Sequence, residues 1–146
     1  AMMVAGKGIP MRMWLAIATL FVALPAWSSS AYTRKYVCKT PKVAQSCYWT
    51  HGQLKFWEGT PSLRLWKVGT TRILGIYSGP ETYPGDLNGD NEHPELPANI
   101  QAKLKPLDNQ IYADFEVCPL ELERPKKIQA ACIEAAKNIV VDDFSK

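Results

Sequence analysis

Residues 46–57 alternate between apolar side chains and polar or aromatic ones. A period of two places successive side chains on opposite faces of a strand, so this stretch predicts a strand with one buried face. Gly52 interrupts the buried set, which indicates a bulge or the close approach of another backbone. The buried set is Tyr48, Thr50, Leu54 and Phe56, and the opposite set is Trp49, His51, Gln53, Lys55 and Trp57.

Two short apolar segments follow and predict a three-stranded meander with the first strand. Residues 63–68 and 72–77 have strand patterns, and turn-forming residues precede each of them. Residues 78–97 are rich in proline, glycine and acidic side chains, which predicts a long surface loop after the meander.

The rest of the chain predicts one short helix and further strands. A proline precedes residues 98–104 and suits the first turn of a helix. Residues 109–118 alternate again, and residues 128–141 predict a last strand or pair of strands with an irregularity at 135–138. Alanine and glutamate leave a helix over residues 128–138 as the alternative. Together the elements predict an all-β fold, a small antiparallel sandwich or barrel with one short helix.

The N-terminal region has the three parts of a secretory signal peptide. Lys7 and Arg12 supply positive charge, residues 13–24 form an apolar run, and small residues follow up to Ala31. This order suits signal peptidase, and the run is shorter than the roughly 20 apolar residues of a membrane span. The sequence therefore predicts cleavage after Ala31 or after Ser28, and no membrane span once the signal is removed.

Cleavage would divide the chain into a signal peptide, residues 1–31, and a single domain, residues 32–146. An alternative start at Met11 would make residues 1–10 an over-called or cloned extension. The predicted destination of the domain is the periplasm or the medium.

All four cysteines lie in the predicted domain. An even number downstream of an export signal predicts two disulfides that staple the fold. The gaps of 9, 71 and 14 residues disfavour a zinc site, which usually pairs cysteines two to four residues apart. The four are Cys38, Cys47, Cys118 and Cys132.

Three connectivities are open for these cysteines. A hairpin centred on Pro125 would set Cys118 opposite Cys132, at a separation that a disulfide can bridge. We therefore predict Cys118–Cys132 and, by elimination, Cys38–Cys47. The main rival is Cys47–Cys118, which would tie the first strand to the fourth.

Charge is unevenly distributed along the predicted domain. Residues 33–72 hold eight basic side chains and one acidic, whereas residues 73–146 hold seven basic and thirteen acidic. The domain therefore has almost no net charge, which disfavours nucleic acid as a partner. In the second half, the hairpin register sets Glu116 against Glu134, and their repulsion predicts a bulge nearby.

The runs CYWTHGQLKFWEGTPSLRLWKVGTTRILGIYSG, DFEVCP and QAACIEAAKN, within residues 47–141, resemble small exported bacterial proteins of unknown function. The resemblance implies an exported all-β domain. It carries no activity, so candidate sites rest on the residues themselves.

Aromatic and polar side chains share one face of the first predicted strand and extend to its neighbour. Flat rings beside amide and imidazole groups suit a sugar or another polar ligand. Alternatively this face packs as a second core layer, with Lys55 extending to solvent. The predicted ligand-binding residues are Trp49, His51, Gln53, Trp57 and Trp66.

The acidic loop places oxygen-bearing side chains at alternate positions, as a calcium loop does. Its predicted ligands are Asp86, Asn88 and Asp90. Asn91 and Pro97 stand where an EF-hand has its glycine and its last glutamate, so a solvated acidic loop is the alternative. No other cofactor is predicted.

Residues suited to catalysis are few. No serine lies in a G-x-S-x-G motif, and two disulfides would leave no free cysteine. Asp114 and Glu116 share an outward strand face, and either could serve a small hydrolase together with His51. We therefore predict a non-catalytic binding or interaction module of the cell envelope, with an envelope glycan or protein as its partner. The alternatives are that small hydrolase and a calcium-stabilised structural domain.

Overall fold

The computed structural model describes residues 2–3, 6, 8, 31–84 and 92–145. The chain divides into two units, residues 1–30 and 31–146, and every described helix and strand belongs to the second. Among the described residues, no helix is long and apolar enough to cross a membrane. The strands are β1 (Tyr48–Phe56), β2 (Leu63–Lys67), β3 (Ile73–Ile76), β4 (Asn109–Pro119) and β5 (Gln129–Asp143), and the helices are α1 (Ala98–Gln101) and the 3-10 turns η1 (Ala44–Ser46) and η2 (Pro80–Thr82).

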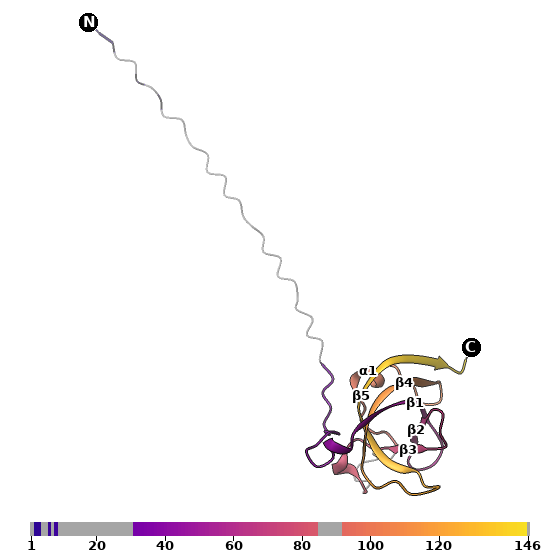
Figure 1. The fold of residues 1–146 in the computed structure, drawn as a ribbon. Helices are drawn as coiled ribbons and strands as arrows, with labels where there is room; N and C mark the ends of the chain where they lie inside the picture. Colours follow the sequence, from indigo (N-terminus) through magenta and orange to yellow (C-terminus); the bar gives the residue numbers. More distant parts are fainter. Residues whose placement is uncertain (1, 4–5, 7, 9–30, 85–91, 146) are drawn as a thin grey trace. The chain divides into compact units, whose positions relative to one another are not determined.

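The five strands form a closed barrel in the order β1-β2-β3-β5-β4, with β4 pairing back onto β1 (Figure 1). β1, β2 and β3 make the predicted antiparallel meander, and β4 and β5 make an antiparallel hairpin. The all-β class with one short helix and two disulfides is confirmed, and the parallel pairing of β3 with β5 adds to it. A five-stranded barrel in this order has the architecture of the OB fold, which hosts many unrelated functions.

Alternate side chains of the strands point inward and fill the barrel. Leu54, Leu65 and Phe115 are fully buried in one continuous core. At Gly52, an added Cβ atom would lie 2.9 Å from the Leu65 side chain and 3.1 Å from the Trp66 carbonyl oxygen. This is the close approach that the glycine predicted, since a side chain there would overlap β2.

The last segment is a strand, not the alternative helix, and it is interrupted by two bulges. Glu116 lies opposite Ala135, so Glu134 is displaced from the position that would have set two carboxylates face to face. A second register shift accommodates Asn138, whose φ of 55° is left-handed. The predicted bulge and the predicted irregularity are thus both present.

The predicted disulfide pairing is wrong, although the strand register behind it is right. Cys118 faces Cys132 across the β4–β5 hairpin, yet the bridges are Cys38–Cys132 and Cys47–Cys118. The backbone hydrogen bond two residues further along the hairpin makes Cys118 and Cys132 a hydrogen-bonded pair. The Cβ atoms of such a pair lie farther apart than those of a non-hydrogen-bonded pair. Both side chains point out of the barrel and are covered by the lead-in segment, residues 31–47, which supplies their partners.

Polar contacts also fix the lead-in segment to the barrel. The Arg34 guanidinium donates to the carbonyl oxygens of Ile133 and Ser78, at 3.0 and 3.2 Å. The Glu95 carboxylate accepts the backbone N–H groups of residues 35–36, at 2.7 and 3.0 Å. Together with the two disulfides, which are typical of an oxidising compartment, these contacts make the segment part of the domain.

Candidate functional site

The outer face of β1 carries the side chains that the sequence singled out. Trp49, His51 and Gln53 occupy alternate positions of the strand, Trp57 follows its end, and Trp66 of β2 lies opposite Gln53. The three tryptophans are 46, 49 and 36% exposed, so they are not packed beneath a second layer. We call this surface, with the outward residues of β4 and β5 beside it, the β1 face.

His51 contacts Asp114 on β4, and Asp114 in turn contacts β5. Its Nδ1 lies 2.9 Å from Oδ1 of Asp114, the residue opposite it on β4. Asn138 on β5 donates to the other carboxylate oxygen at 2.7 Å. Hydrogen bonds from Asn138 and His51 hold the pKa of Asp114 below its usual value. An ionised carboxylate only accepts, so Nδ1 carries the proton, and Nε2 remains for a hydrogen bond to a ligand.

A second network fixes the middle of the β1 face. The Gln53 amide nitrogen donates to Oε1 of Gln110 and to the Tyr112 hydroxyl oxygen, both at 2.8 Å. The Gln110 amide in turn donates to Asp142 at 2.7 Å. These bonds leave the Gln53 carbonyl oxygen as an acceptor and the Tyr112 O–H as a donor. Polar atoms are therefore held in fixed positions between the tryptophans.

Lysines on the β1 face are engaged with aromatic rings. The Lys137 ammonium lies 4.3 Å from the centre of the Trp49 ring. The Lys55 ammonium lies 4.7 Å from the rings of both Trp57 and Phe144. Such cation–π contacts hold the rings in place and partly satisfy the charges.

Glu116 does not join the arrangement around His51. Its carboxylate forms an ion pair with Lys39, 2.5 Å away, and this pairing raises the pKa of Lys39. Of the two carboxylates proposed for a hydrolase, only Asp114 contacts the histidine.

The outer face of β3 is covered by the chain itself. An added Cβ atom at Gly75 would lie 2.4 Å from the Pro61 side chain and 3.1 Å from Ile128. Arg64 fastens the loop that carries Pro61, since it donates to the carbonyl oxygens of Pro61 and Glu58. The outer face of β3 is thus covered at Gly75, whereas the tryptophans of β1 and β2 are exposed.

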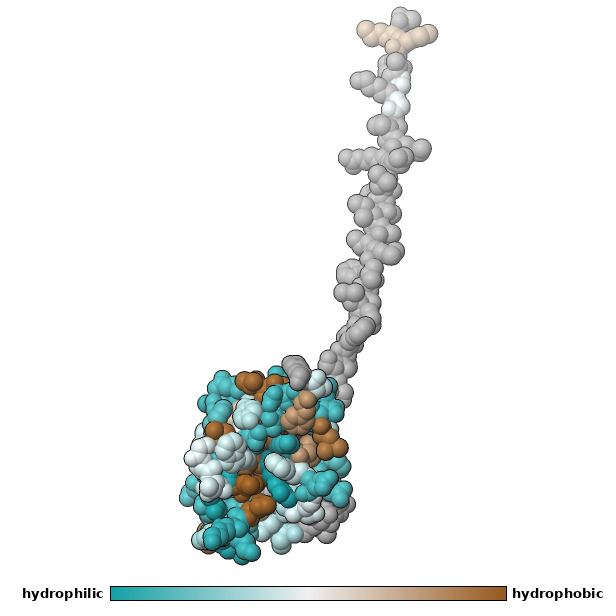
Figure 2. Space-filling view, turned by 90° about the vertical axis from the view of Figure 1, so that its right-hand side faces the viewer, coloured by the Kyte–Doolittle hydropathy of each residue, from teal (hydrophilic) through white to brown (hydrophobic). Residues whose placement is uncertain are grey.

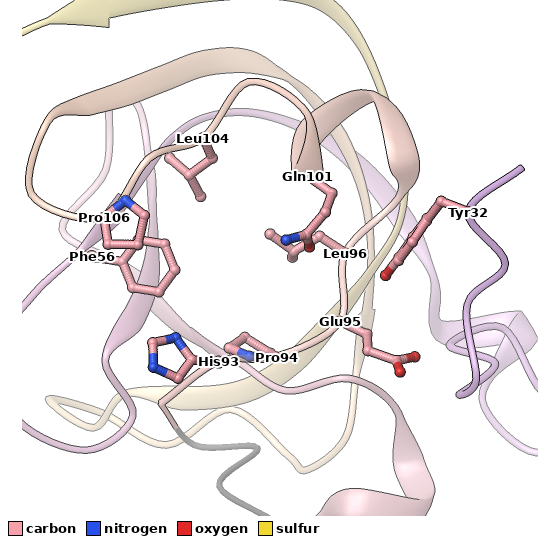
Figure 3. Close-up of a pocket in the computed structure, with 9 residues that line it drawn as sticks. All are labelled: Tyr32, Phe56, His93, Pro94, Glu95, Leu96, Gln101, Leu104 and Pro106. Atoms are coloured by element: carbon pink, nitrogen blue, oxygen red, sulfur yellow. The ribbon is translucent and has the colours of Figure 1, made fainter. Parts of the chain in front are cut away.

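A pocket of about 290 Å³ lies at the α1 end of the barrel (Figure 3). The buried leucines Leu96 and Leu104 and the ring of Phe56 form its apolar surface. Gln101 of α1 points into it, and His93 lies across the opening from Leu104 (Figure 3). No pattern in the sequence marked this site, because its residues come from the lead-in segment, the end of β1 and residues 93–106, which are far apart in the chain.

A second pocket, of about 320 Å³, continues the first towards the β1 face. It shares Phe56 and His93 with the first pocket, and Trp57 lines it. Trp57 also ends the β1 face, so the face and the two pockets adjoin.

The predicted calcium ligands Asp86, Asn88 and Asp90 lie outside the described residues. Calcium binding therefore stays a prediction.

On the side drawn in Figure 2, strongly hydrophobic residues lie in small groups between hydrophilic ones.

The sequence predicted only some of the residues that form hydrogen bonds on the β1 face. The sequence indicated Asp114 and His51 as neighbours of one site, but not the contributions of Gln110, Asn138 and Asp142.

No known protein family, curated protein or solved structure matches the chain.

Proposed function

We propose that this domain is a non-catalytic binding module of the cell envelope and that it holds an uncharged glycan chain along the β1 face. One observation carries the proposal: two hydrogen-bonded networks hold polar atoms in fixed positions between exposed tryptophans. A site whose side chains are already ordered loses little conformational entropy when a ligand binds.

The chemistry of the face suits sugars. A sugar ring has apolar C–H faces that pack on aromatic rings and hydroxyl groups that donate and accept hydrogen bonds. Trp49 and Trp57 are eight residues apart, about 26 Å along an extended strand, which favours a chain over a single ring. Between them, His51 Nε2 can form a hydrogen bond, the Gln53 carbonyl oxygen is an acceptor, and the Tyr112 hydroxyl is a donor.

Charge argues against a nucleic acid ligand. Binding of a phosphate backbone needs cations that are free to pair with it. Lys55 and Lys137 lie over aromatic rings, and the carboxylates of Asp114 and Asp142 share their surface. An anionic chain would meet these carboxylates.

Direct binding tests the proposal. Soluble β-1,4-linked N-acetylglucosamine oligomers, a chemistry common to envelope glycans, are titrated into the domain with both disulfides formed. Binding is measured by calorimetry and by tryptophan fluorescence. Trp49→Ala removes a stacking ring worth about 1 kcal/mol and should weaken binding roughly fivefold to tenfold.

Leu122→Ala is the matched control, because Leu122 is 88% exposed on the β4–β5 loop and lies off the β1 face. It should bind like the unchanged protein. Equal affinity of Trp49→Ala and the unchanged domain would refute the proposal. So would capture of an envelope protein whose binding depends on Trp49 while no oligosaccharide binds.

The hydrolase alternative has one specific observation in its favour, the 2.9 Å contact between His51 and Asp114. A carboxylate that orients a histidine is part of many catalytic sites. Among the described residues, however, no serine or cysteine side chain hydrogen-bonds to His51 as a nucleophile would. If the alternative is correct, the bound oligosaccharides are cleaved, and His51→Ala abolishes cleavage.

A further inference from the structure

We propose that the pocket beside α1 binds the terminal ring of the glycan chain, so that the domain recognises a chain end and not only a chain surface. This inference rests on the proposed function and names the part of the ligand that decides affinity. The β1 face would then hold the rings that follow the first.

The size of the pocket fits one ring. Its volume of about 290 Å³ lies at the lower end of the range for small-molecule sites. Leu96 and Leu104, which are 2% and 8% exposed, line the pocket and belong to the core, so the pocket ends on that side (Figure 3). A chain that enters from the second pocket would place its end against these leucines.

The chemistry of the pocket fits a neutral polar ring. Among the described residues, none hydrogen-bonds to the side chain of Gln101 or of His93, so these side chains can offer their donors and acceptors to a ligand. The Glu95 carboxylate accepts two backbone N–H groups and points away from the cavity (Figure 3). An amide and an imidazole over an apolar floor suit hydroxyl or acetamido groups on a ring, whereas an isolated charge would meet no partner.

A path leads from the pocket to the β1 face. The second pocket joins them, since it contains Phe56 and His93 of the first and Trp57 of the face. Leu107 lines this second pocket with a left-handed backbone, φ 67°, and is 79% exposed. A leucine rarely adopts this conformation, and residues held in it cluster at ligand sites. Leu107 would therefore pack against the ring next to the terminal one.

The test compares oligomers that differ only at their ends. The tetrasaccharide of N-acetylglucosamine is used unmodified, reduced to the alditol at one end, or methylated at O4 of the other end. One of the two modifications should weaken binding at least tenfold, because the modified ring no longer fits the pocket. In amide NMR spectra, the monosaccharide should shift residues around Gln101, and longer oligomers should also shift the β1 face.

Variants separate the pocket from the face. Gln101→Ala should lose the discrimination between modified and unmodified ends, whereas Lys103→Ala, a matched change of an exposed neighbour, should keep it. Trp49→Ala should weaken oligomers that are long enough to reach from the pocket to Trp49, but it should leave the monosaccharide unaffected.

Two results would overturn the inference and leave the proposed function intact. The first is that both end-modified tetrasaccharides bind as tightly as the unmodified one. The second is that Gln101→Ala still discriminates between modified and unmodified ends while Trp49→Ala weakens binding. Failure of every oligomer to bind would overturn both.

Discussion

Removal of one disulfide at a time is the sharpest test of how this domain is held together. In Cys47→Ala/Cys118→Ala, only Cys38–Cys132 remains, and in Cys38→Ala/Cys132→Ala only Cys47–Cys118 remains. The bridges span 94 and 71 residues of sequence, but they share their loops. The stability that is lost with one bridge therefore depends on whether the other bridge is present.

The magnitude follows from loop closure. With one bridge formed, the second closes a ring made only of residues 38–47 and 118–132, about 25 residues, which is worth about 3.5 kcal/mol. With no other bridge, either one closes a loop of 70 or more residues and is worth about 4.5 kcal/mol. Each variant that keeps one native bridge should thus lose about 3.5 kcal/mol of its free energy of unfolding, and the variant without cysteines should lose about 8 kcal/mol. Because a domain of this size has about 5–15 kcal/mol of stability, the last variant should be largely unfolded.

Urea unfolding monitored by tryptophan fluorescence and circular dichroism measures these losses, and thiol titration under denaturing conditions checks the pairing. The two variants that each keep one native bridge should contain no free thiol. Cys38→Ala/Cys47→Ala is the matched control: it also keeps two cysteines, but they belong to different native bridges. It should lose both bridges and unfold like the variant without cysteines.

The reasoning fails if both two-cysteine variants lose less than about 1 kcal/mol. It also fails if the control is as stable as they are, because Cys118 and Cys132 would then pair with each other as readily as with the lead-in segment.

Three further predictions concern the barrel. Gly75→Ala places a Cβ atom against Pro61, so we expect urea unfolding to give a loss of about 1–3 kcal/mol. Phe115→Ala empties a fully buried site and should cost about 3–5 kcal/mol in the same assay. Glu121 accepts hydrogen bonds from the Tyr83 hydroxyl and from a backbone N–H, and they hold its pKa below its usual value. The stability that it contributes is therefore present above the ordinary carboxyl range and is lost as the pH falls through its lowered pKa. Glu121→Gln should accordingly be less stable than the unchanged protein at neutral pH and show a weaker loss on acidification; a pH profile of equal steepness would contradict this.

Local patterns predicted what depends on neighbouring residues. The alternation around Gly52 gave β1 and its outward side chains correctly, because the period of a strand is a property of the backbone. The hairpin register that sets Cys118 opposite Cys132 was also predictable, since a short connection between two strands leaves few alternatives.

Features that depend on distant segments were not predictable in the same way. The disulfides follow from how the lead-in segment lies across the barrel, and nothing in its sequence shows where it docks. The covering of Gly75 by Pro61 and the pocket around Gln101 arise where irregular segments meet strands, so they carry no period that a sequence could display.

The Cys38–Cys132 bridge has a mechanical consequence. A pulling force applied between residues 31 and 145 passes from the lead-in segment through the disulfide directly into β5. Residues 39–131, which contain β1 to β4 and all of the pocket beside α1 except Tyr32, then lie outside the path of the load. Only residues 31–38 and 132–145 can be drawn out, about 70 Å of extended chain, against about 400 Å for a chain without bridges. Tension would therefore peel the C-terminal part of β5 from β4, and with it Asn138 from Asp114, while Trp49 and the rest of β1 carried no load.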